Sequence, residues 1–410
     1  MHYVIIGNSY AALGAITGIR SIDKTSPITL ISKEEYPSYA RPVISYVLMG
    51  KAKEEHLPLR SDEFWSQNGV NVMLGKEAVK IDSEAHTVSL ASGENISYDR
   101  LLLATGSVPF IPPMKGLENV EKKFTFMTWA DMKAVEKACS KKSDVLIMGA
   151  GLIGLKAADG LLDRVKSITV VDLADRVLPS ILDQEGSEIV KREMEKKGIT
   201  FHLGTSAEEF RAKSVTLKNG REVTFDVLIM AVGVRPAVKL AADAGAQVGR
   251  GIRVDDMCRT SVADIYAAGD VAEEKEFTTG EDRIIAIIPN ATLQGECAGI
   301  NMAGGEKHFE NPVAMNAIGF FGTHIITAGT YTGEAEVMKE RDSYKKFFVK
   351  DDRLMGFILM GRAVDRAGIY TSLVRGAVPL SSIDWETLKM KPLLAAFALR
   401  ERKKMLSKEV

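Results

Sequence analysis

The sequence of 410 residues predicts an α/β protein that contains the same βαβ unit twice, followed by a small α+β domain. Three observations lead to this prediction. A glycine-rich turn follows a short apolar run at residues 3–6 and again at residues 145–148. An Ala- and Leu-rich segment comes after each turn, as expected for a helix that packs on a sheet. From residue 311 the chain changes to short runs rich in Gly, Phe and Thr that resemble strands.

The composition is that of a globular protein and excludes several classes. Apolar residues make up 46% and charged residues 26%, and a net charge of -1 attracts neither nucleic acid nor an acidic membrane. No apolar run is long enough to span a membrane, and a predicted strand begins at once with no basic leader, so we expect a cytoplasmic protein. Cys139, Cys258 and Cys297 show neither metal-binding nor disulfide spacing, and we expect no metal site.

The first turn reads Gly7-x-Ser9-x-x-Ala12. The pattern G-x-G-x-x-G between a strand and a helix is typical of dinucleotide binding. Its glycines allow the backbone to approach a pyrophosphate, whose charge lies at the helix N-terminus. Ser9 replaces the middle glycine. The next predicted strand, residues 28–31, leads to Glu34, about where an acid that binds ribose is expected.

The second turn carries the complete pattern, with Gly149, Gly151, Ile153 and Gly154. Asp172 ends the next apolar run eighteen residues later, where a carboxylate accepts hydrogen bonds from a ribose diol. No arginine stands in the two positions after Asp172 to favour a 2′-phosphate, although Arg176 is close. We therefore expect NADH rather than NADPH. Two such turns in one chain predict that electrons pass between two dinucleotides.

Each half then repeats a hairpin and a buried strand that ends in glycine. The strands lie at residues 99–106, which end in Ala104-Thr105-Gly106, and at residues 226–233, which end at Gly233. Prolines at positions 109, 112 and 113 indicate a crossing between domains. The predicted domains are residues 1–115 with 236–310, residues 116–235, residues 311–382 and a helical tail over 383–410.

These motifs, taken in order, resemble the two-dinucleotide flavoprotein family related to glutathione reductase. The motifs that carry the resemblance, over roughly residues 1–310, are Gly7-x-x-x-x-Ala12, Ala104-Thr105-Gly106, Gly149-x-Gly151-x-x-Gly154, Gly233-Val234-Arg235-Pro236 and Ala268-Gly269-Asp270. The resemblance implies an FAD-binding domain interrupted by an NAD-binding domain. Tyr39-Ala40-Arg41-Pro42 is similar to the Y-x-R-P stretch of the rubredoxin- and ferredoxin-reductase branch.

The resemblance also implies roles for single residues. Asp270 matches the acid that holds the ribityl and pyrophosphate part of FAD, Arg41 lies against the FAD, and Asn290 belongs to a segment that passes the isoalloxazine ring. Lys156 stands where many relatives carry a glutamate near the nicotinamide. The implied FAD residues are Gly7, Ser9, Ala12, Glu34, Arg41, Ala104, Thr105, Gly106, Gly269, Asp270 and Asn290. The implied NAD residues are Gly149, Gly151, Ile153, Gly154, Asp172 and Gly233.

One departure from the family indicates the function. Disulfide reductases of this family carry a redox cysteine just after the first βαβ unit, whereas residues 41–48 contain none. A thiolate relay is impossible without a thiol beside the flavin. The resemblance then implies hydride transfer from NADH to the flavin N5 and release of single electrons to an iron–sulfur partner. That partner is a rubredoxin- or ferredoxin-type protein or an iron–sulfur subunit.

Two other functions stay open. The first is that of an enzyme with another acceptor, either an NADH oxidase that gives hydrogen peroxide or a reductase of a small oxidised molecule. The second is that of a non-catalytic redox sensor that binds both dinucleotides. Cys297 is interpreted as a buried helix residue without a redox role. The sequence leaves open the direction of electron flow and whether the chain forms a homodimer.

Overall fold

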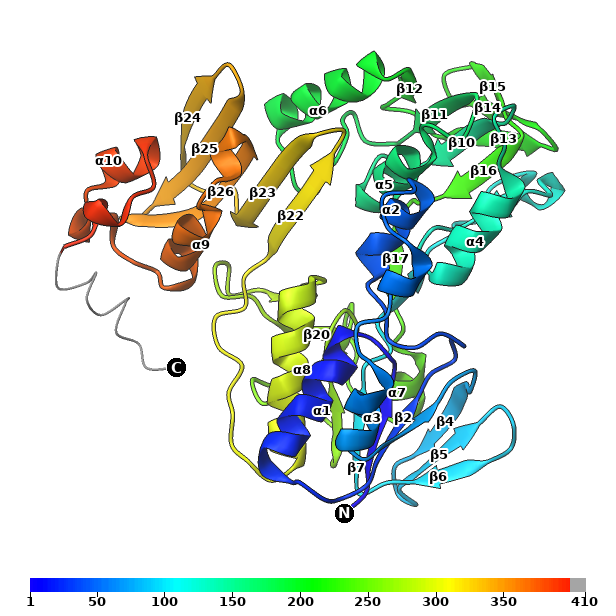
Figure 1. Ribbon diagram of the computed structural model, residues 1–410, viewed down its shortest axis with the longest axis vertical. Helices are drawn as coiled ribbons and strands as arrows, with labels where there is room; N and C mark the ends of the chain where they lie inside the picture. Colours follow the sequence, from blue (N-terminus) through cyan, green and yellow to red (C-terminus); the bar gives the residue numbers. More distant parts are fainter. Residues whose placement is uncertain (399–410) are drawn as a thin grey trace. The chain divides into compact units, whose positions relative to one another are not determined.

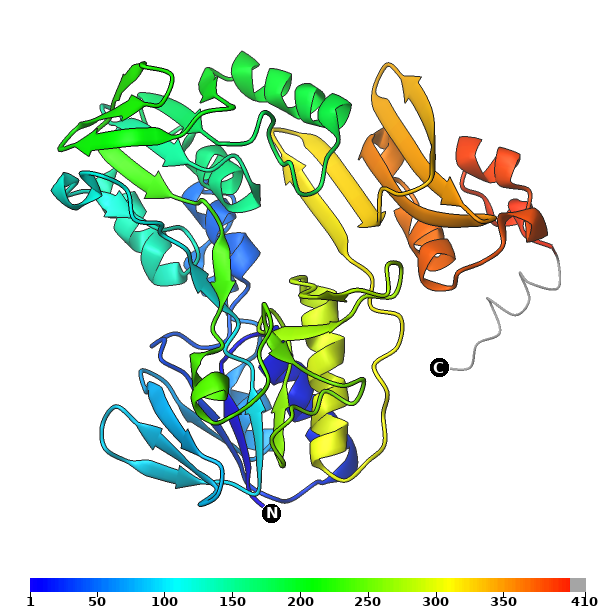
Figure 2. The same ribbon diagram turned by 180° about the vertical axis from the view of Figure 1, so that it is seen from behind.

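The computed structural model describes residues 1–398, and Figures 1 and 2 show it from opposite sides. The chain forms two compact units. The first contains residues 1–274 and 288–309, and the second contains residues 275–287 and 310 onward. Among the described residues, no helix has both the length and the apolar character that crossing a membrane requires.

The first unit contains two parallel five-stranded sheets. The first sheet has the strand order β19-β7-β1-β2-β3, and its β1 pairs with β2 and β7. Its strands are β1 (Tyr3–Ile6), β2 (Ile28–Ile31), β3 (Val70–Met73), β7 (Arg100–Leu103) and β19 (Ile265–Ala267). The residues of β1 and β2 are all buried, because layers of structure cover both faces of a parallel sheet.

The second sheet repeats this arrangement. Its order is β12-β11-β10-β16-β9, with β10 between β11 and β16 in parallel pairing. Its strands are β9 (Lys123–Phe124), β10 (Asp144–Met148), β11 (Ser167–Val171), β12 (Ile199–His202) and β16 (Val227–Met230). The α/β fold class with two Rossmann-like sheets, predicted from the repeated glycine-rich turns, is confirmed.

Helices and small sheets surround the two main sheets. The helices of the first unit are α1 (Tyr10–Ile22), α2 (Ile44–Leu48), α3 (Asp62–Gln67), α4 (Trp129–Ala138), α5 (Leu152–Leu161), α6 (Gln184–Lys196), α7 (Lys239–Asp243) and α8 (Ile288–Met302). The small strands are β4 (Ala78–Asp82), β5 (Thr87–Leu90), β6 (Asn95–Ser97), β13 (Ala207–Arg211), β14 (Ser214–Leu217), β15 (Glu222–Thr224), β18 (Ile252–Arg253) and β20 (Ala272–Lys275). They include the two hairpins that the sequence predicts, and in one of the small sheets β18 pairs with β20 in parallel.

Glycines allow α1 and α8 to pack backbone against backbone, side by side in both views (Figures 1 and 2). A Cβ atom on Gly14 would lie 3.1 Å from the carbonyl carbon of Thr292, and one on Gly295 would lie 2.8 Å from that of Ala11. Side chains at these positions would separate the helices. The close contact places the N-terminal half of α8 beside the helix that follows the first glycine-rich turn.

A two-stranded antiparallel ribbon connects the two halves of the first unit. Strand β8 (Ser107–Pro109) pairs with β17 (Val234–Pro236), so the two crossings of the chain run next to each other. The guanidinium of Arg235 lies 4.3 Å from the ring centroid of Phe110 and covers the ribbon. The ribbon occupies the place where the prolines indicate a domain crossing, although the domain boundaries themselves stay a prediction.

The second unit contains a five-stranded antiparallel sheet of order β22-β23-β26-β25-β24. Its elements are β21 (Asp282–Arg283), β22 (Met315–Phe320), β23 (Thr323–Gly329), β24 (Glu334–Glu340), β25 (Ser343–Lys350), β26 (Arg353–Gly361), α9 (Ala367–Arg375) and α10 (Trp385–Met390). Tyr370 of α9 packs on Phe347 and Phe357 in its core.

Two observations concern the predicted domain plan, which stays a prediction. Residues 275–287, assigned from the sequence to the first domain, belong to the second compact unit. In the predicted helical tail, α10 is helical, but residues 391–398 contain only a 3-10 turn at Leu394–Ala396, because Pro392 interrupts the helix. The rest of the tail, residues 399–410, lies outside the described residues.

Candidate dinucleotide-binding sites

The first glycine-rich turn connects β1 to α1 and requires glycine at its first position. Gly7 has a φ of 120°, and a Cβ atom there would lie 2.6 Å from the carbonyl carbon of Ala104. Ser9 is the N-cap residue of α1, and its side chain caps no backbone N–H group. The first N–H groups of α1 therefore point out of the helix end, where they can bind an anion. Ala12 is fully buried beneath them.

The Ala104-Thr105-Gly106 motif, which follows β7, lies beside the Gly7 turn. Ala104 contacts the position of Gly7, and Gly106 has a φ of 63°. The Thr105 hydroxyl donates a 3.0 Å hydrogen bond to the carbonyl of Ala237, whose N–H donates to the carbonyl of Gly106 at 2.9 Å. This motif therefore ties the end of β7 to the chain as it returns through β17.

Asp270 lies half-buried at the end of β19. Burial raises the pKa of its carboxyl group, and the nearby Arg41 guanidinium opposes that shift. Within residues 1–398, no group donates a hydrogen bond to this carboxylate. Gly269 has a φ of 81° and its N–H donates a 2.7 Å hydrogen bond to Oε1 of Gln294. A partly buried acceptor without a donor, beside an open helix end, fits the ribityl hydroxyls and pyrophosphate of FAD.

The structure brings Glu34 and Arg41 together in an ion pair. The other carboxylate oxygen of Glu34 accepts a 2.7 Å hydrogen bond from the Tyr39 hydroxyl, which in turn accepts one of 3.0 Å from the N–H of Trp129. Arg41 also donates to the carbonyl of Met127 at 3.3 Å. Arg41 thus pairs with Glu34 and also acts electrostatically on Asp270, and the role of Glu34 at ribose stays a prediction.

The second glycine-rich turn connects β10 to α5. Gly149 has a φ of 116°, and a Cβ atom there would lie 2.6 Å from the carbonyl carbon of Ala231. Gly154 packs against Gly149 itself, where a Cβ atom would lie 3.1 Å from the Gly149 carbonyl carbon. Gly151 faces open space and caps α5 without a side chain, with Ile153 in the first turn of the helix. Gly149 and Gly154 therefore shape the turn, and Gly151 leaves room for a ligand.

Asp172 binds the backbone of this turn. One carboxylate oxygen accepts a hydrogen bond from the N–H of Ala150 at 2.5 Å, and the other accepts one from the N–H of Ala174 at 2.7 Å. Gly233 has a φ of 127° and open space beside it. Arg176 pairs with Asp175 at 3.0 Å. Asp172 fixes the glycine-rich turn from within the protein, and its hydrogen bonds to a ribose stay a prediction.

Lys156 lies where α5 meets α2. Its Nζ is 4.7 Å from the ring centroid of Tyr46 and 3.4 Å from the carboxylate of Asp159. One turn later, a Cβ atom on Gly160 would lie 3.2 Å from the carbonyl oxygen of Ser45, so the two helices are in close contact. The cation therefore sits in the contact between the two halves of the first unit.

Asn290 and Gln294 lie one turn apart on α8 and are both buried. Nδ2 of Asn290 donates a 2.8 Å hydrogen bond to the carboxylate of Glu274. Glu274 is absent from the residues that the sequence predicts for the site. Glutamate side chains are mostly exposed in folded proteins, yet those of Glu273 and Glu274 are both buried.

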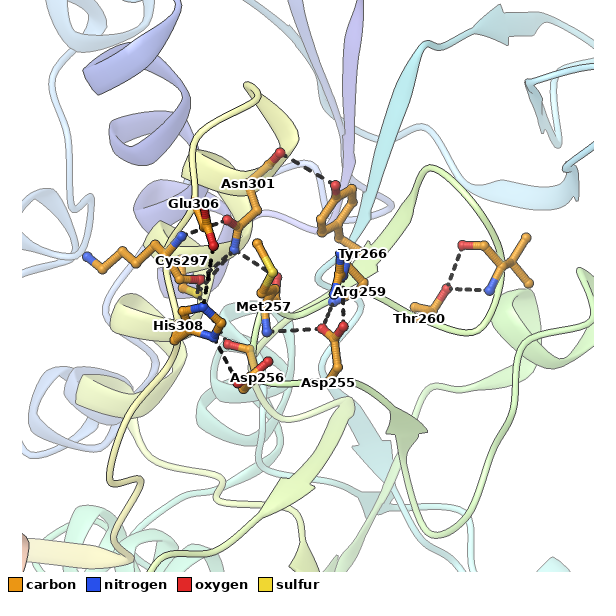
Figure 3. A network of polar contacts seen from close by, with 12 residues as sticks. Asp255, Asp256, Met257, Arg259, Thr260, Tyr266, Cys297, Asn301, Glu306 and His308 are labelled. Carbon is orange, nitrogen blue, oxygen red and sulfur yellow. Dashed lines mark hydrogen bonds and ion pairs between the residues drawn. The ribbon is translucent and has the colours of Figure 1, made fainter.

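None of the three cysteines, Cys139, Cys258 and Cys297, belongs to residues 41–48. Cys139 is half-buried, and burial raises its pKa to about 11. Cys297 is fully buried in α8, as the sequence predicts, and Figure 3 shows it among polar groups. Its thiol donates a 3.1 Å hydrogen bond to the carbonyl of Lys307 and accepts one of 3.5 Å from Nδ2 of Asn301. This network fixes the chain that follows α8.

Comparisons with known proteins agree with this geometry. Residues 1–295 match the family model described as "Pyridine nucleotide-disulphide oxidoreductase". The NADH-dependent phenylglyoxylate dehydrogenase subunit epsilon of Aromatoleum evansii is 31% identical over 386 residues, which are 91% of each chain. The NADH oxidase of Methanocaldococcus jannaschii is 33% identical over 337 residues, covering 78% of this chain and 74% of that protein.

Two further likenesses concern reductases of electron carriers. The rubredoxin-NAD(+) reductase of Pseudomonas putida is 27% identical over 310 residues, covering 74% of this chain and 80% of that protein. The covalent putidaredoxin reductase–putidaredoxin complex matches in fold with a TM-score of 0.88 and 22% identity, covering 100% of this chain and 99% of that one. The family model spans more than half of the sequence, and two glycine-rich turns occupy equivalent places on two Rossmann-like sheets. This chain therefore belongs to the pyridine nucleotide-disulphide oxidoreductase family and is an NAD(P)H-dependent flavoprotein oxidoreductase that uses FAD and NADH.

Proposed function

We propose that this flavoprotein accepts hydride from NADH and passes the electrons singly to an iron–sulfur protein or partner subunit. Bound FAD supplies the chemistry, since a flavin exchanges electrons both in pairs and singly. The observation that carries the proposal is the absence of a cysteine from residues 41–48, which form a 3-10 turn and α2. Without a thiol in this segment, the family's route to disulfide substrates is closed.

In this proposal the chain holds FAD along the first sheet. The N-terminus of α1 and the Gly7 turn bind the pyrophosphate, and Asp270 accepts hydrogen bonds from the ribityl hydroxyls. Arg41, held by its ion pair with Glu34, would supply a positive charge to this site. Ala104, Thr105 and Gly106 would form part of the same site, since the backbone of Ala104 lies against Gly7.

The second sheet presents NADH. The Gly149 turn, held by Asp172, binds the NADH pyrophosphate at the N-terminus of α5, and Gly233 leaves space for the dinucleotide. Lys156 acts as a positioning residue, because its contacts with Tyr46 and Asp159 set how α5 lies against α2.

Two relatives support the class of acceptor. One is named for rubredoxin and NAD+, and another is named as a subunit of an NADH-dependent dehydrogenase. Both names agree with electron exchange between this chain and a second protein or subunit. The three cysteines form no disulfide in the described structure, which favours a reducing compartment, and we propose the cytoplasm.

A second candidate function is an NADH oxidase that gives hydrogen peroxide. The relative that favours it is the NADH oxidase of M. jannaschii, at 33% identity. The same cysteine-free segment would limit such an oxidase to peroxide, because the thiol needed to reduce peroxide further is absent from residues 41–48.

An anaerobic titration followed by acceptor assays tests the proposal. We expect about one equivalent of NADH to bleach the flavin absorbance, with a much weaker response to NADPH. The reduced protein should then reduce a rubredoxin or ferredoxin faster than oxygen, and glutathione disulfide not at all. Faster reoxidation by oxygen with stoichiometric peroxide would establish the oxidase instead. A flavin that NADH leaves oxidised would favour the non-catalytic sensor.

A further inference from the structure

The first unit contains a buried carboxyl group that the proposed electron transfer does not use. Glu274 lies on β20, four residues after Asp270, and is 7% exposed. Its carboxylate accepts the 2.8 Å hydrogen bond from Nδ2 of Asn290. Among residues 1–398, no lysine, arginine or histidine forms an ion pair with it. A charge here is therefore compensated by an amide dipole and not by a cation.

This carboxyl group is connected to the FAD site through α8. Gln294, one turn after Asn290, accepts the 2.7 Å hydrogen bond from the N–H of Gly269, next to Asp270. The Gln294 amide also faces Glu274, although its Nε2 is outside hydrogen-bonding geometry with any described group. Because these groups are buried, a change of charge at one is weakly screened at its neighbours.

The charge of Glu274 changes near neutral pH. Burial raises its pKa to about 7, and the Asn290 and Gln294 amides oppose that shift. Contact with Cys297 and burial raise the pKa of the Cys258 thiol well above its usual value, so this thiol stays neutral. At Asp270 burial raises the pKa and Arg41 opposes the shift.

The neighbouring Glu273 has a different environment. Successive side chains of a strand point to opposite faces. Glu273 is 6% exposed and accepts a 3.2 Å hydrogen bond from the N–H of Gly251, away from α8. It is therefore a matched comparison for Glu274, with equal burial, the same strand and no contact with Asn290.

We propose that Glu274 binds a proton when the bound FAD is reduced and releases it when the electrons leave. Hydride brings two electrons and one proton, so the cofactor site gains one negative charge. The Glu274 carboxylate then takes one proton from solvent, forming an O–H bond, and becomes neutral. When two one-electron acceptors remove the electrons, two protons leave for solvent: the one that arrived with the hydride and the one held by the Glu274 carboxyl group. The inference rests on FAD binding and is independent of the acceptor's identity.

The test is the pH dependence of the midpoint potential of bound FAD, measured at equilibrium with a redox dye between pH 5 and 9. Each additional proton taken up changes the reduction equilibrium tenfold per pH unit, which is about 30 mV for a two-electron couple. We expect wild type to show one additional proton around pH 7. In a plot of midpoint potential against pH, this proton appears as a steeper region. Glu274→Gln should lose the steeper region, whereas Glu273→Gln should keep it. Equal slopes for wild type and Glu274→Gln would overturn the proposal.

A second variant keeps the test decisive if Glu274→Gln does not retain FAD. Asn290→Ala leaves the carboxyl group in place and removes a hydrogen bond that lowers its pKa. The steeper region should therefore move to higher pH. A region that stays at the same pH would exclude Glu274 as the proton-binding group. Because the potential is measured without NADH or an iron–sulfur protein, failure here is separate from failure of the proposed function.

Discussion

Replacing Gly295 by alanine tests whether the contact between α1 and α8 supports the FAD site. A Cβ atom at this position would lie 2.8 Å from the carbonyl carbon of Ala11 and closer still to its oxygen. Ordinary contact begins near 3.4 Å, so the two helix backbones must separate by at least about 0.6 Å. The obstacle is main chain and cannot rotate away.

The expected loss of stability follows from two opposing effects. Overpacking of a well-packed core costs up to about 3 kcal/mol, whereas replacing glycine by alanine inside a helix returns about 1 kcal/mol. We therefore expect Gly295→Ala to lower the free energy of unfolding by about 2 kcal/mol. For a domain of this size, that corresponds to a melting temperature lower by roughly 4–8 °C. FAD retention should fall as well, because Gln294 holds Gly269.

The measurement is thermal unfolding with and without added FAD, together with the flavin content after purification. Gly368→Ala is the matched control, since Gly368 lies in α9 and a Cβ atom there meets nothing within 4 Å. This variant should be as stable as wild type or slightly more so. If Gly295→Ala melts at the wild-type temperature with full flavin content, the helix contact does not support the site.

Three further predictions concern single carboxylates and their partners. Asp172→Asn places an amide NH2 group opposite one of the two N–H donors and removes a charge-assisted hydrogen bond of about 1.5–3 kcal/mol. NADH binding, measured by fluorescence titration, should weaken roughly 10- to 100-fold. The FAD content should stay unchanged. Glu274 has a folded pKa of about 7 against a reference of 4.5, so the folded protein binds the additional proton and stability falls as pH rises through this window. Apoprotein carrying Glu274→Gln should therefore gain up to about 3 kcal/mol over wild type between pH 5 and pH 8 in urea unfolding, and a parallel pH dependence would argue against a buried charge. Lys156→Met should lower the melting temperature more than the double variant with Asp159→Asn, because the single change keeps the charge of Asp159 and removes the ammonium group 3.4 Å from it. Additive effects would show that the pair is not coupled.

The two sheets were predictable because each begins with a signal that is local in sequence. Gly7 and Gly149 both have a positive φ and both contact the backbone of a distant strand, at Ala104 and Ala231. Only glycine satisfies both requirements, so the two turns can be recognised from glycine at these positions in the sequence. Continuous apolar runs beside each turn then indicate strands that are buried on both faces.

The contacts inside the site were less predictable, because they depend on which distant segments meet. The ion pair of Arg41 with Glu34 requires the chain between them to fold back. The environment of Glu274 depends on α8, which reaches it from sixteen residues further along the chain. Two adjacent glutamates carry no local signal of burial, and only tertiary packing explains their position.

The ribbon of β8 and β17 has a consequence for how such a protein can be rearranged. Ser107 pairs with Pro236, so the intervening residues leave and re-enter the first half at a single point. A segment whose two ends are neighbours can be removed, or exchanged for one with another nucleotide preference, without altering how the remaining strands are connected. The segment that contains the second sheet can therefore be exchanged as a unit. A chimera joined at this ribbon would change the electron donor while keeping the flavin site.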